Sequence, residues 1–97
     1  APGALVEEVC AEVGGTVIAI DNFRLARIAR LAGAPMDAGA GVDLLRKVGD
    51  EVAAGEPLYR VHAHFPADFR FALNVVARDA GYRIGARDEI PRMEGEF

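Results

Sequence analysis

Glycines and prolines interrupt this chain so often that only short helices and strands fit between them. Gly14-Gly15 is the first interruption, and the others are Gly33 to Pro35, Gly39 to Gly41, Gly49-Asp50, Gly55 to Pro57, Pro66 and Gly81. Glycine favours turns and helix ends, and proline cannot continue a helix. We therefore expect short elements joined by tight turns.

A strand followed by a helix is the clearest local prediction. Thr16–Ile20 is rich in β-branched residues and predicts a short strand that is buried on both faces. Asp21 can cap a helix over Asn22–Ala32, because its carboxylate accepts from the free N–H groups of the first turn. Gly33 and Pro35 mark the end of this helix. The apolar face of this helix consists of Leu25, Ile28, Ala29 and Ala32. The opposite face carries an arginine stripe, Arg24, Arg27 and Arg30.

The second half of the chain predicts three more extended segments and one more helix. The extended segments are a strand over Val42–Val48, a short stretch at Glu51–Val52 and a strand over Leu58–His64. Pro66 is suited to the first position of a helix. The residues expected on the buried face of this helix are Phe69, Leu73, Val76 and Ala80, and Gly81 is expected to end it. Tyr82–Ile84 is expected to be a last short strand. This order predicts an α+β domain with largely antiparallel strands.

The segment Leu5–Val13 is ambiguous by periodicity. Leu5, Val9 and Val13 recur every four residues, as in a helix, whereas Val9, Ala11 and Val13 also alternate with polar neighbours, as in a strand. The pattern leaves both alternatives open.

Composition excludes several classes of protein. The chain has 97 residues, of which 52% are hydrophobic, and this suits one globular domain. Cys10 is the single cysteine, so a disulfide scaffold is excluded. The net charge of −4 disfavours nucleic acid as a partner. No apolar run is long enough for a membrane helix and no signal peptide is recognisable, so we expect a cytoplasmic protein. The chain begins Ala-Pro-Gly without Met, and we expect a piece of a longer protein.

Two cationic or glycine-rich features could in principle bind phosphate. Gly39-Ala40-Gly41 lacks both the Gly-Lys-Ser/Thr ending of a Walker loop and the third glycine of a dinucleotide fingerprint. We interpret it as a backbone turn or close approach. The arginine stripe could bind an acidic partner, but a solvated helix face that pairs with Asp and Glu elsewhere is the favoured interpretation.

Histidine and cysteine are the remaining candidates for chemistry. His62 and His64 could chelate a metal from one face of a strand, with Cys10, Asp37 or Asp68 as a third ligand, but no spacing rule links these residues. Two partly exposed histidines at a strand end are the favoured interpretation. Cys10 has no recognisable base and is interpreted as a small buried hydrophobic residue. We therefore assign no catalytic, cofactor or metal residue.

The pattern Gly49-Asp50-x-Val52-x-x-Gly55-x-x-Leu58 resembles the hairpin of biotinyl and lipoyl carrier domains. Carriers display a modified lysine at the tip of a β-turn. Lys47, the only lysine, lies just before Gly49-Asp50, and no Met-Lys-Met or Asp-Lys-Ala sequence surrounds it. A free-standing carrier-like or ligand-binding module without a modified lysine is therefore the alternative hypothesis.

A longer succession of motifs favours another family. It comprises Gly15-x-Val17-x-x-Ile20-Asp21, then Ala29-x-x-Ala32-Gly33-Ala34-Pro35-x-Asp37-x-Gly39-Ala40-Gly41-Val42-x-Leu44, then Lys47-x-Gly49-Asp50-x-Val52-x-x-Gly55-Glu56-Pro57-Leu58, and finally His62-Ala63. This succession resembles the C-terminal domain of the thymidine and pyrimidine-nucleoside phosphorylases, and is most similar to the "putative thymidine phosphorylase" and AMP phosphorylase branch. The resemblance implies an α/β-hammerhead, or barrel-sandwich hybrid, fold and makes Leu5–Val13 a strand.

The resemblance also implies a division of labour. The whole enzymes are dimeric pentosyltransferases that split a nucleoside with inorganic phosphate, giving free base and (deoxy)ribose 1-phosphate. Their phosphate and nucleoside sites lie in other domains, so no catalytic residue is carried over to this chain. We expect residues 1–85 to be a structural domain that packs on the parent's catalytic domains and is inactive alone. Residues 86–97 are expected to be a charged, flexible tail.

Overall fold

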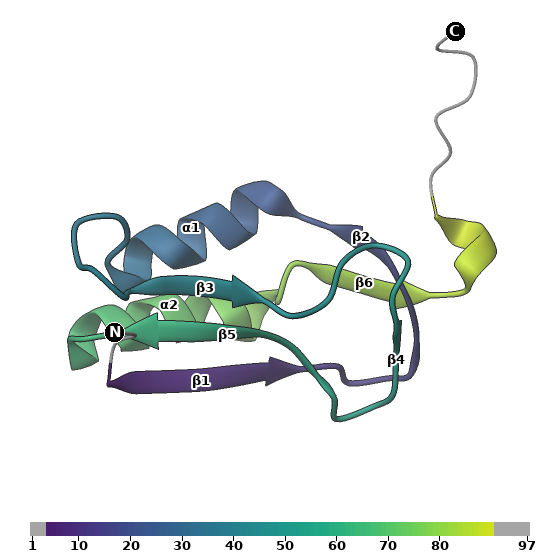
Figure 1. The fold of residues 1–97 in the computed structure, drawn as a ribbon, viewed down its shortest axis with the longest axis horizontal. Helices are drawn as coiled ribbons and strands as arrows, with labels where there is room; N and C mark the ends of the chain where they lie inside the picture. Colours follow the sequence, from purple (N-terminus) through teal and green to yellow (C-terminus); the bar gives the residue numbers. More distant parts are fainter. Residues whose placement is uncertain (1–3, 91–97) are drawn as a thin grey trace, which may run out of the picture.

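The computed structural model describes residues 4–90 (Figure 1). These residues form six strands, two α-helices and one short 3₁₀ helix. In chain order they are β1 (Leu5–Cys10), β2 (Gly15–Ile20), α1 (Asn22–Ala32), β3 (Gly41–Leu44), β4 (Glu51–Val52), β5 (Pro57–Ala63), α2 (Pro66–Arg78), β6 (Tyr82–Gly85) and η1 (Arg87–Glu89).

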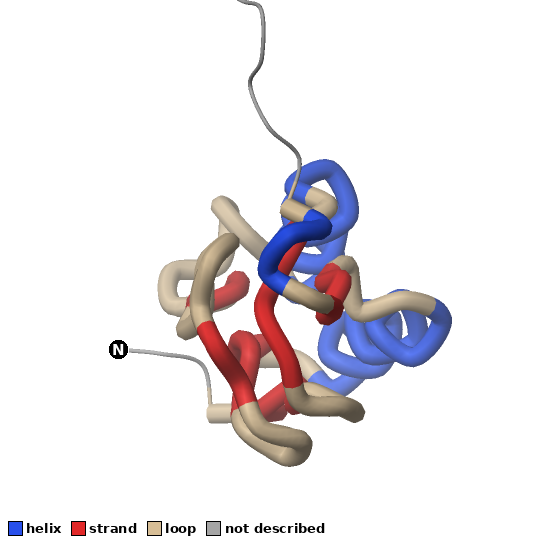
Figure 2. Tube along the Cα trace, turned by 90° about the vertical axis from the view of Figure 1, so that its right-hand side faces the viewer, coloured by secondary structure: helices blue, strands red, loops and turns tan. Residues whose placement is uncertain are grey.

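The strands make two three-stranded antiparallel sheets. The first has the order β1-β5-β3 and the second the order β4-β2-β6. In the first sheet, Leu5 lies opposite Ala63, and Gly41 lies opposite His62. Both α-helices lie on one side of the strands, where they pack on each other and on β5 (Figure 2). The predicted α+β class, with antiparallel strands and two helices, is confirmed.

Helix α1 begins and ends where the sequence predicts. The Asp21 carboxylate accepts a hydrogen bond of 3.0 Å from the Arg24 N–H, and the Gly33 N–H donates to the Arg30 carbonyl at 3.0 Å. The predicted apolar face is also confirmed, since Leu25, Ile28 and Ala32 are its buried residues. Local signals alone therefore define this helix.

Removing the cap of α1 should destabilise the domain measurably. We expect Asp21→Ala to lower the free energy of unfolding by about 1 kcal/mol, because the Arg24 N–H loses its acceptor. Asp21→Asn is the matched control, since its side-chain oxygen can still accept, and it should cost a few tenths of a kcal/mol at most. Urea denaturation checks both variants, and equal losses would contradict the capping role.

Two predicted boundaries are wrong. The second helix ends at Arg78 with Asp79 as its C-cap, not at Gly81, because the Asp79 backbone is extended and its carboxylate accepts from the Gly81 N–H at 2.7 Å. The strand predicted over 42–48 is only Gly41–Leu44. Beyond Leu44 the chain leaves the ladder, and the next two N–H groups both donate to the Leu58 carbonyl.

The ambiguous N-terminal segment is a strand over Leu5–Cys10, as the family resemblance implies. Its pairing with β5 explains why the four-residue periodicity misleads, because Val9 faces the core while its neighbours Glu8 and Cys10 are exposed. Ala11 to Val13 lie outside the strand. The Ala11 N–H nevertheless donates to the Glu56 carbonyl at 2.8 Å, which continues the contact.

The core lies between the helices and the two sheets. Its largest fully buried side chains are Tyr59, Ile28, Val17 and Val61. Tyr59, from the first sheet, stacks on Tyr82, from the second, with ring centroids 5.6 Å apart. The two sheets therefore share one aromatic contact at the centre of the molecule.

The first residues of the tail predicted over 86–97 include a short 3₁₀ helix. This helix, η1, spans Arg87–Glu89 and packs near β2, and the Glu89 carboxylate accepts from the Ala86 N–H at 2.6 Å. Residues 91–97 lie outside the described residues, so the domain boundary at 85 and the flexibility of the tail stay predictions. Among residues 4–90, no helix has the length and apolar character needed to cross a membrane.

Candidate functional site

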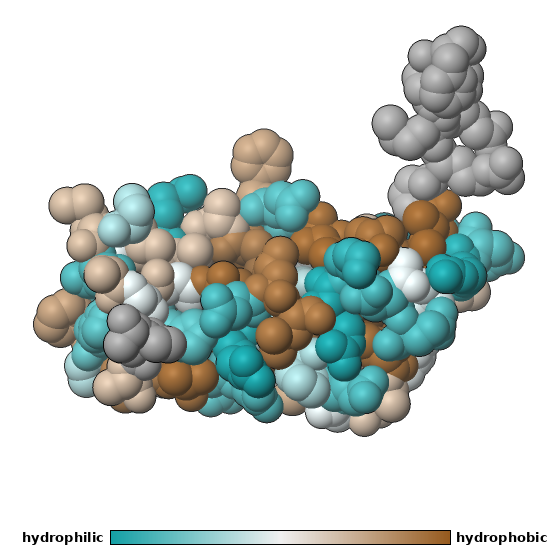
Figure 3. Space-filling model, in the orientation of Figure 1, coloured by the Kyte–Doolittle hydropathy of each residue, from teal (hydrophilic) through white to brown (hydrophobic). Residues whose placement is uncertain are grey.

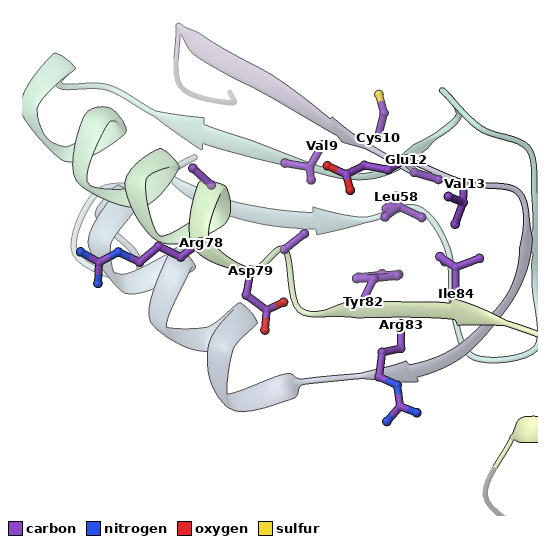
Figure 4. Close-up of a pocket in the computed structure, with 13 residues that line it drawn as sticks. Val9, Cys10, Glu12, Val13, Leu58, Arg78, Asp79, Tyr82, Arg83 and Ile84 are labelled. Carbon is purple, nitrogen blue, oxygen red and sulfur yellow. The ribbon is translucent and has the colours of Figure 1, made fainter.

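One groove is an opening between the two sheets, with a volume of about 470 Å³ (Figure 4). One wall is the end of β1 and the residues after it, Val9 to Val13. The other wall runs from the end of α2 into β6, Ala77 to Ile84. No short segment of the sequence indicates this groove, because its walls are far apart in the chain and meet only through the pairing of the strands.

The groove is lined by both apolar and charged residues. Val9, Leu58, Tyr82 and Ile84 contribute apolar surface, while the charged residues that line it are Glu12, Arg78, Asp79 and Arg83. The Tyr82 hydroxyl donates to the Arg46 carbonyl at 2.6 Å, and burial raises the pKa of this hydroxyl. The Tyr82 hydroxyl therefore has a structural hydrogen-bonding role. Among the described residues that line the groove, no nucleophile is paired with a base.

Cys10 is exposed, so its interpretation as a buried hydrophobic residue is wrong. Strand alternation explains the error, because Val9 takes the inward position and Cys10 the outward one. In Figure 4 the Cys10 sulfur points away from Tyr82 and Ile84. The thiol therefore lies on the surface, beside the groove.

The two histidines make separate contacts. His62 lies within β5, only 8% exposed, with its Nε2 2.8 Å from an Asp43 carboxylate oxygen. His64 lies beyond the strand, exposed, and its Nε2–H donates to the Ala38 carbonyl at 2.6 Å. The expectation of two partly exposed histidines is thus wrong for His62. Within residues 4–90 no group of three or more His, Cys, Asp or Glu residues is placed to hold a metal ion.

The contact between Asp43 and His62 is a polar contact that the sequence pattern does not predict. Asp43 lies opposite Arg60 in the register of β3 and β5, and His62 lies two pairs further along, opposite Gly41 and on the same face of the sheet. On the same sheet the Arg60 Nε is 2.9 Å from a Glu8 carboxylate oxygen of β1. Alternation within each strand could have suggested such pairs, but only the register between strands identifies them.

Lys47 stands at the start of a tight turn. The Asp50 N–H donates to the Lys47 carbonyl at 3.0 Å, and the Lys47 N–H donates to the Asp50 carboxylate at 2.8 Å. The hydrogen bond from the Lys47 N–H to the Asp50 carboxylate holds the pKa of Asp50 below its usual range. The Lys47 Nζ lies 3.7 Å from the same carboxylate. Lys47 therefore belongs to the first position of the turn, not to its tip.

The two candidate phosphate sites have structural explanations. Gly41 is buried at the start of β3, opposite His62, so the loop Gly39 to Gly41 leads into a strand and not into a helix N-terminus. Gly39 and Gly41 both have positive φ angles, of +86° and +140°, which agrees with the interpretation of this loop as a backbone turn. In the arginine stripe, Arg27 and Arg30 are exposed and Arg24 lies 3.7 Å from the Asp79 carboxylate. The stripe is thus an exposed helix face that makes one ion pair, with Asp79 at the C-terminal end of α2.

The described residues define a class: a small α+β domain of two antiparallel sheets that gathers no recognisable catalytic group. Comparison with known proteins gives the family. Residues 16–84 match the family model described as pyrimidine nucleoside phosphorylase C-terminal domain, and the chain belongs to this family.

Full-length relatives support the same assignment. The chain is 56% identical to a "Putative thymidine phosphorylase" of Methylococcus capsulatus over 99% of its own length and 19% of the relative. It is 50% identical to a protein of the same name from Albidiferax ferrireducens, over 98% of the chain and 18% of the relative. A third relative, the "Bifunctional ribose 1,5-bisphosphokinase-thymidine phosphorylase" of Cupriavidus pinatubonensis, is 52% identical over 75% of the chain and 12% of its own length.

The chain spans about a fifth of the first two relatives and less of the third. The family resemblance drawn from the motifs is confirmed. The alternative of a free-standing carrier-like module gains no support from the family model or from the names of these relatives.

Proposed function

We propose that this chain is the C-terminal structural domain of a pyrimidine-nucleoside phosphorylase of the thymidine phosphorylase type. The parent enzyme splits a pyrimidine nucleoside with inorganic phosphate, giving free base and (deoxy)ribose 1-phosphate. The observation that carries the proposal is the family match over residues 16–84, combined with 56% identity across nearly the whole chain to a relative about five times longer.

The role proposed for the domain itself is architectural. Phosphorolysis needs groups that hold phosphate and stabilise the departing base, brought together within one cleft. The described residues bring no such set of groups together in one cleft: the histidines have separate partners, the thiol is on the surface, and the glycine loop leads into a strand. As the family resemblance implies, phosphate and nucleoside are expected to bind other domains of the parent, on which this domain packs.

A comparison of the isolated chain with the parent enzyme tests this proposal. Each is mixed with inorganic phosphate and thymidine, uridine or AMP, and free base is measured by chromatography. We expect base from the parent and none from the 97-residue chain. Turnover by the isolated chain would refute the architectural role. A parent that releases base from none of the three substrates would refute the phosphorylase assignment.

The parent's partners and location are part of the proposal. We expect a cytoplasmic homodimer that needs no cofactor and binds neither nucleic acid nor membrane. Sedimentation of the parent measures the oligomeric state, and a monomer at working concentration would contradict the homodimer.

A further inference from the structure

One end of the domain combines the start of the first strand with exposed apolar side chains. Leu5 lies opposite Ala63, so β1 begins beside the last residue of β5 (Figure 1). His64 and Phe65 follow Ala63 directly. The His64 Nε2–H donates to the Ala38 carbonyl at 2.6 Å, which holds the loop between α1 and β3 at this same end. We call the surface of Val6, Met36, His64 and Phe65 the entry surface.

The entry surface exposes large apolar side chains from three separate segments. Met36, in the loop after α1, is 90% exposed, and Phe65, before α2, is 54% exposed. Val6, on β1 opposite His62, is also exposed, and the Phe65 ring lies edge-on to the ring of His64, with centroids 6.5 Å apart. Single exposed apolar residues are ordinary, but several from separate segments at one end of a domain suit that end to an interface.

The opposite end of the domain has a different surface. It consists of the turns at Lys47–Asp50 and Ala53–Glu56 and the helix η1, whose exposed residues are mostly small or charged. The exposed large apolar residues here are Val48 and, in the nearby turn between β1 and β2, Val13. In Figure 3 hydrophilic side chains gather over the lower right of the visible face, and the most hydrophobic ones lie over its middle and upper part. The opposite end is therefore suited to water.

The preceding part of a full-length protein reaches the domain near the start of β1. The family is a C-terminal domain and the first two relatives are about five times longer, so most of such a polypeptide precedes residue 1. Four residues separate that point from Leu5, and they span at most about 14 Å. From this position we infer that the entry surface is where the preceding domain of the same polypeptide docks. This inference rests on the proposed function only in requiring a longer parent.

Oxidation of Met36 in the parent protein tests the inference directly. Dilute hydrogen peroxide converts exposed methionine to its sulfoxide, and peptide mass spectrometry measures the rate at Met36. We expect the rate in the native parent to be at least fivefold below that in the urea-unfolded parent. A smaller difference would overturn the inference, because a side chain that is 90% exposed in this domain would then remain uncovered.

Photocross-linking identifies what covers the surface. Phe65 is replaced by p-benzoylphenylalanine in the parent, and Phe23, which is 91% exposed on α1, is replaced in a matched control. An equal mixture of unlabelled and ¹⁵N-labelled parent is unfolded and refolded together before irradiation. We expect position 65, but not position 23, to cross-link to upstream residues of the same isotope.

Cross-links between isotopes would assign the cover to a second copy and overturn the inference, as would an absence of upstream cross-links at position 65. Neither measurement depends on turnover. A parent without phosphorylase activity would therefore refute the proposed function and leave the docking inference standing, and the converse also holds.

Discussion

Replacing Tyr59 with alanine is expected to lower the free energy of unfolding by about 3–5 kcal/mol. Tyr59 is fully buried on β5, at the centre of the first sheet. Truncation removes its ring contacts and leaves a cavity that the two sheets can fill only partly. Native domains are stable by about 5–15 kcal/mol, so this loss is a large part of the total.

The cost is large because Tyr59 belongs to a reciprocal contact between the sheets. Its hydroxyl donates to the Ala80 carbonyl at 2.8 Å, just before β6. Tyr82 of β6 stacks on the Tyr59 ring, and its own hydroxyl donates to the Arg46 carbonyl, just after β3. Each tyrosine thus holds the backbone beside the other's sheet, and removing one ring weakens both attachments.

The variant Tyr59→Phe separates the hydroxyl from the ring. It should cost about 1–2 kcal/mol, because the Ala80 carbonyl loses its partner while the ring remains. Burial raises the pKa of the Tyr59 hydroxyl well above its ordinary value of 10.0. The protonated form is therefore favoured in the folded state. Stability from this group is complete below about pH 10 and declines as the pH rises towards the folded-state pKa. Tyr59→Phe should lose this part of the alkaline decline.

Urea denaturation at neutral pH and at several alkaline pH values measures these effects. Phe23→Ala is the matched control, since it removes an aromatic ring that is almost fully exposed, and it should change stability by no more than about 0.5 kcal/mol. If Tyr59→Ala does not fold, Tyr59→Phe still reports on the hydroxyl. A Tyr59→Ala variant as stable as the Phe23→Ala control would contradict the bridge between the sheets.

Local sequence signals predicted where helices form better than they predicted which strands pair with each other. Helix α1 was predictable because Asp21, Gly33 and the apolar face act within one short segment. β1 was not, since its strand conformation depends on pairing with β5, about fifty residues away in the chain. The same distance explains the error at Cys10, whose exposure is fixed by which side of β1 faces the core.

The chemistry of the surface was predictable only in part. The sequence allowed the glycine loop and the arginine stripe to be interpreted as structural, because their motifs were incomplete. It could not reveal the contact between Asp43 and His62, which needs the register of β3 against β5. The groove between β1 and β6 likewise depends on both sheets, so no short segment carries a signal for it.

Gly15→Ala is expected to destabilise the domain by about 2–4 kcal/mol, through backbone conformation and through a clash with a backbone oxygen and a side-chain methyl group. Gly15 begins β2 with a φ of +150°, which side chains other than that of glycine rarely allow. A Cβ there would lie 2.8 Å from the Gly85 carbonyl oxygen and 3.0 Å from the Ile84 Cγ2. Neither neighbour can move freely, because both belong to β6, which pairs with β2.

Gly55→Ala is the matched control for this position. Gly55 also has a positive φ, of +90°, but a Cβ there would meet no atom within 4 Å. It should therefore cost only the conformational strain, about 1–2 kcal/mol. The difference between the two variants measures how closely β6 approaches β2, and thermal and urea unfolding of both determine it. If the two glycines proved equally tolerant of alanine, the tight packing of the second sheet at Gly15 would be contradicted, while the turn at Gly55 would be unaffected.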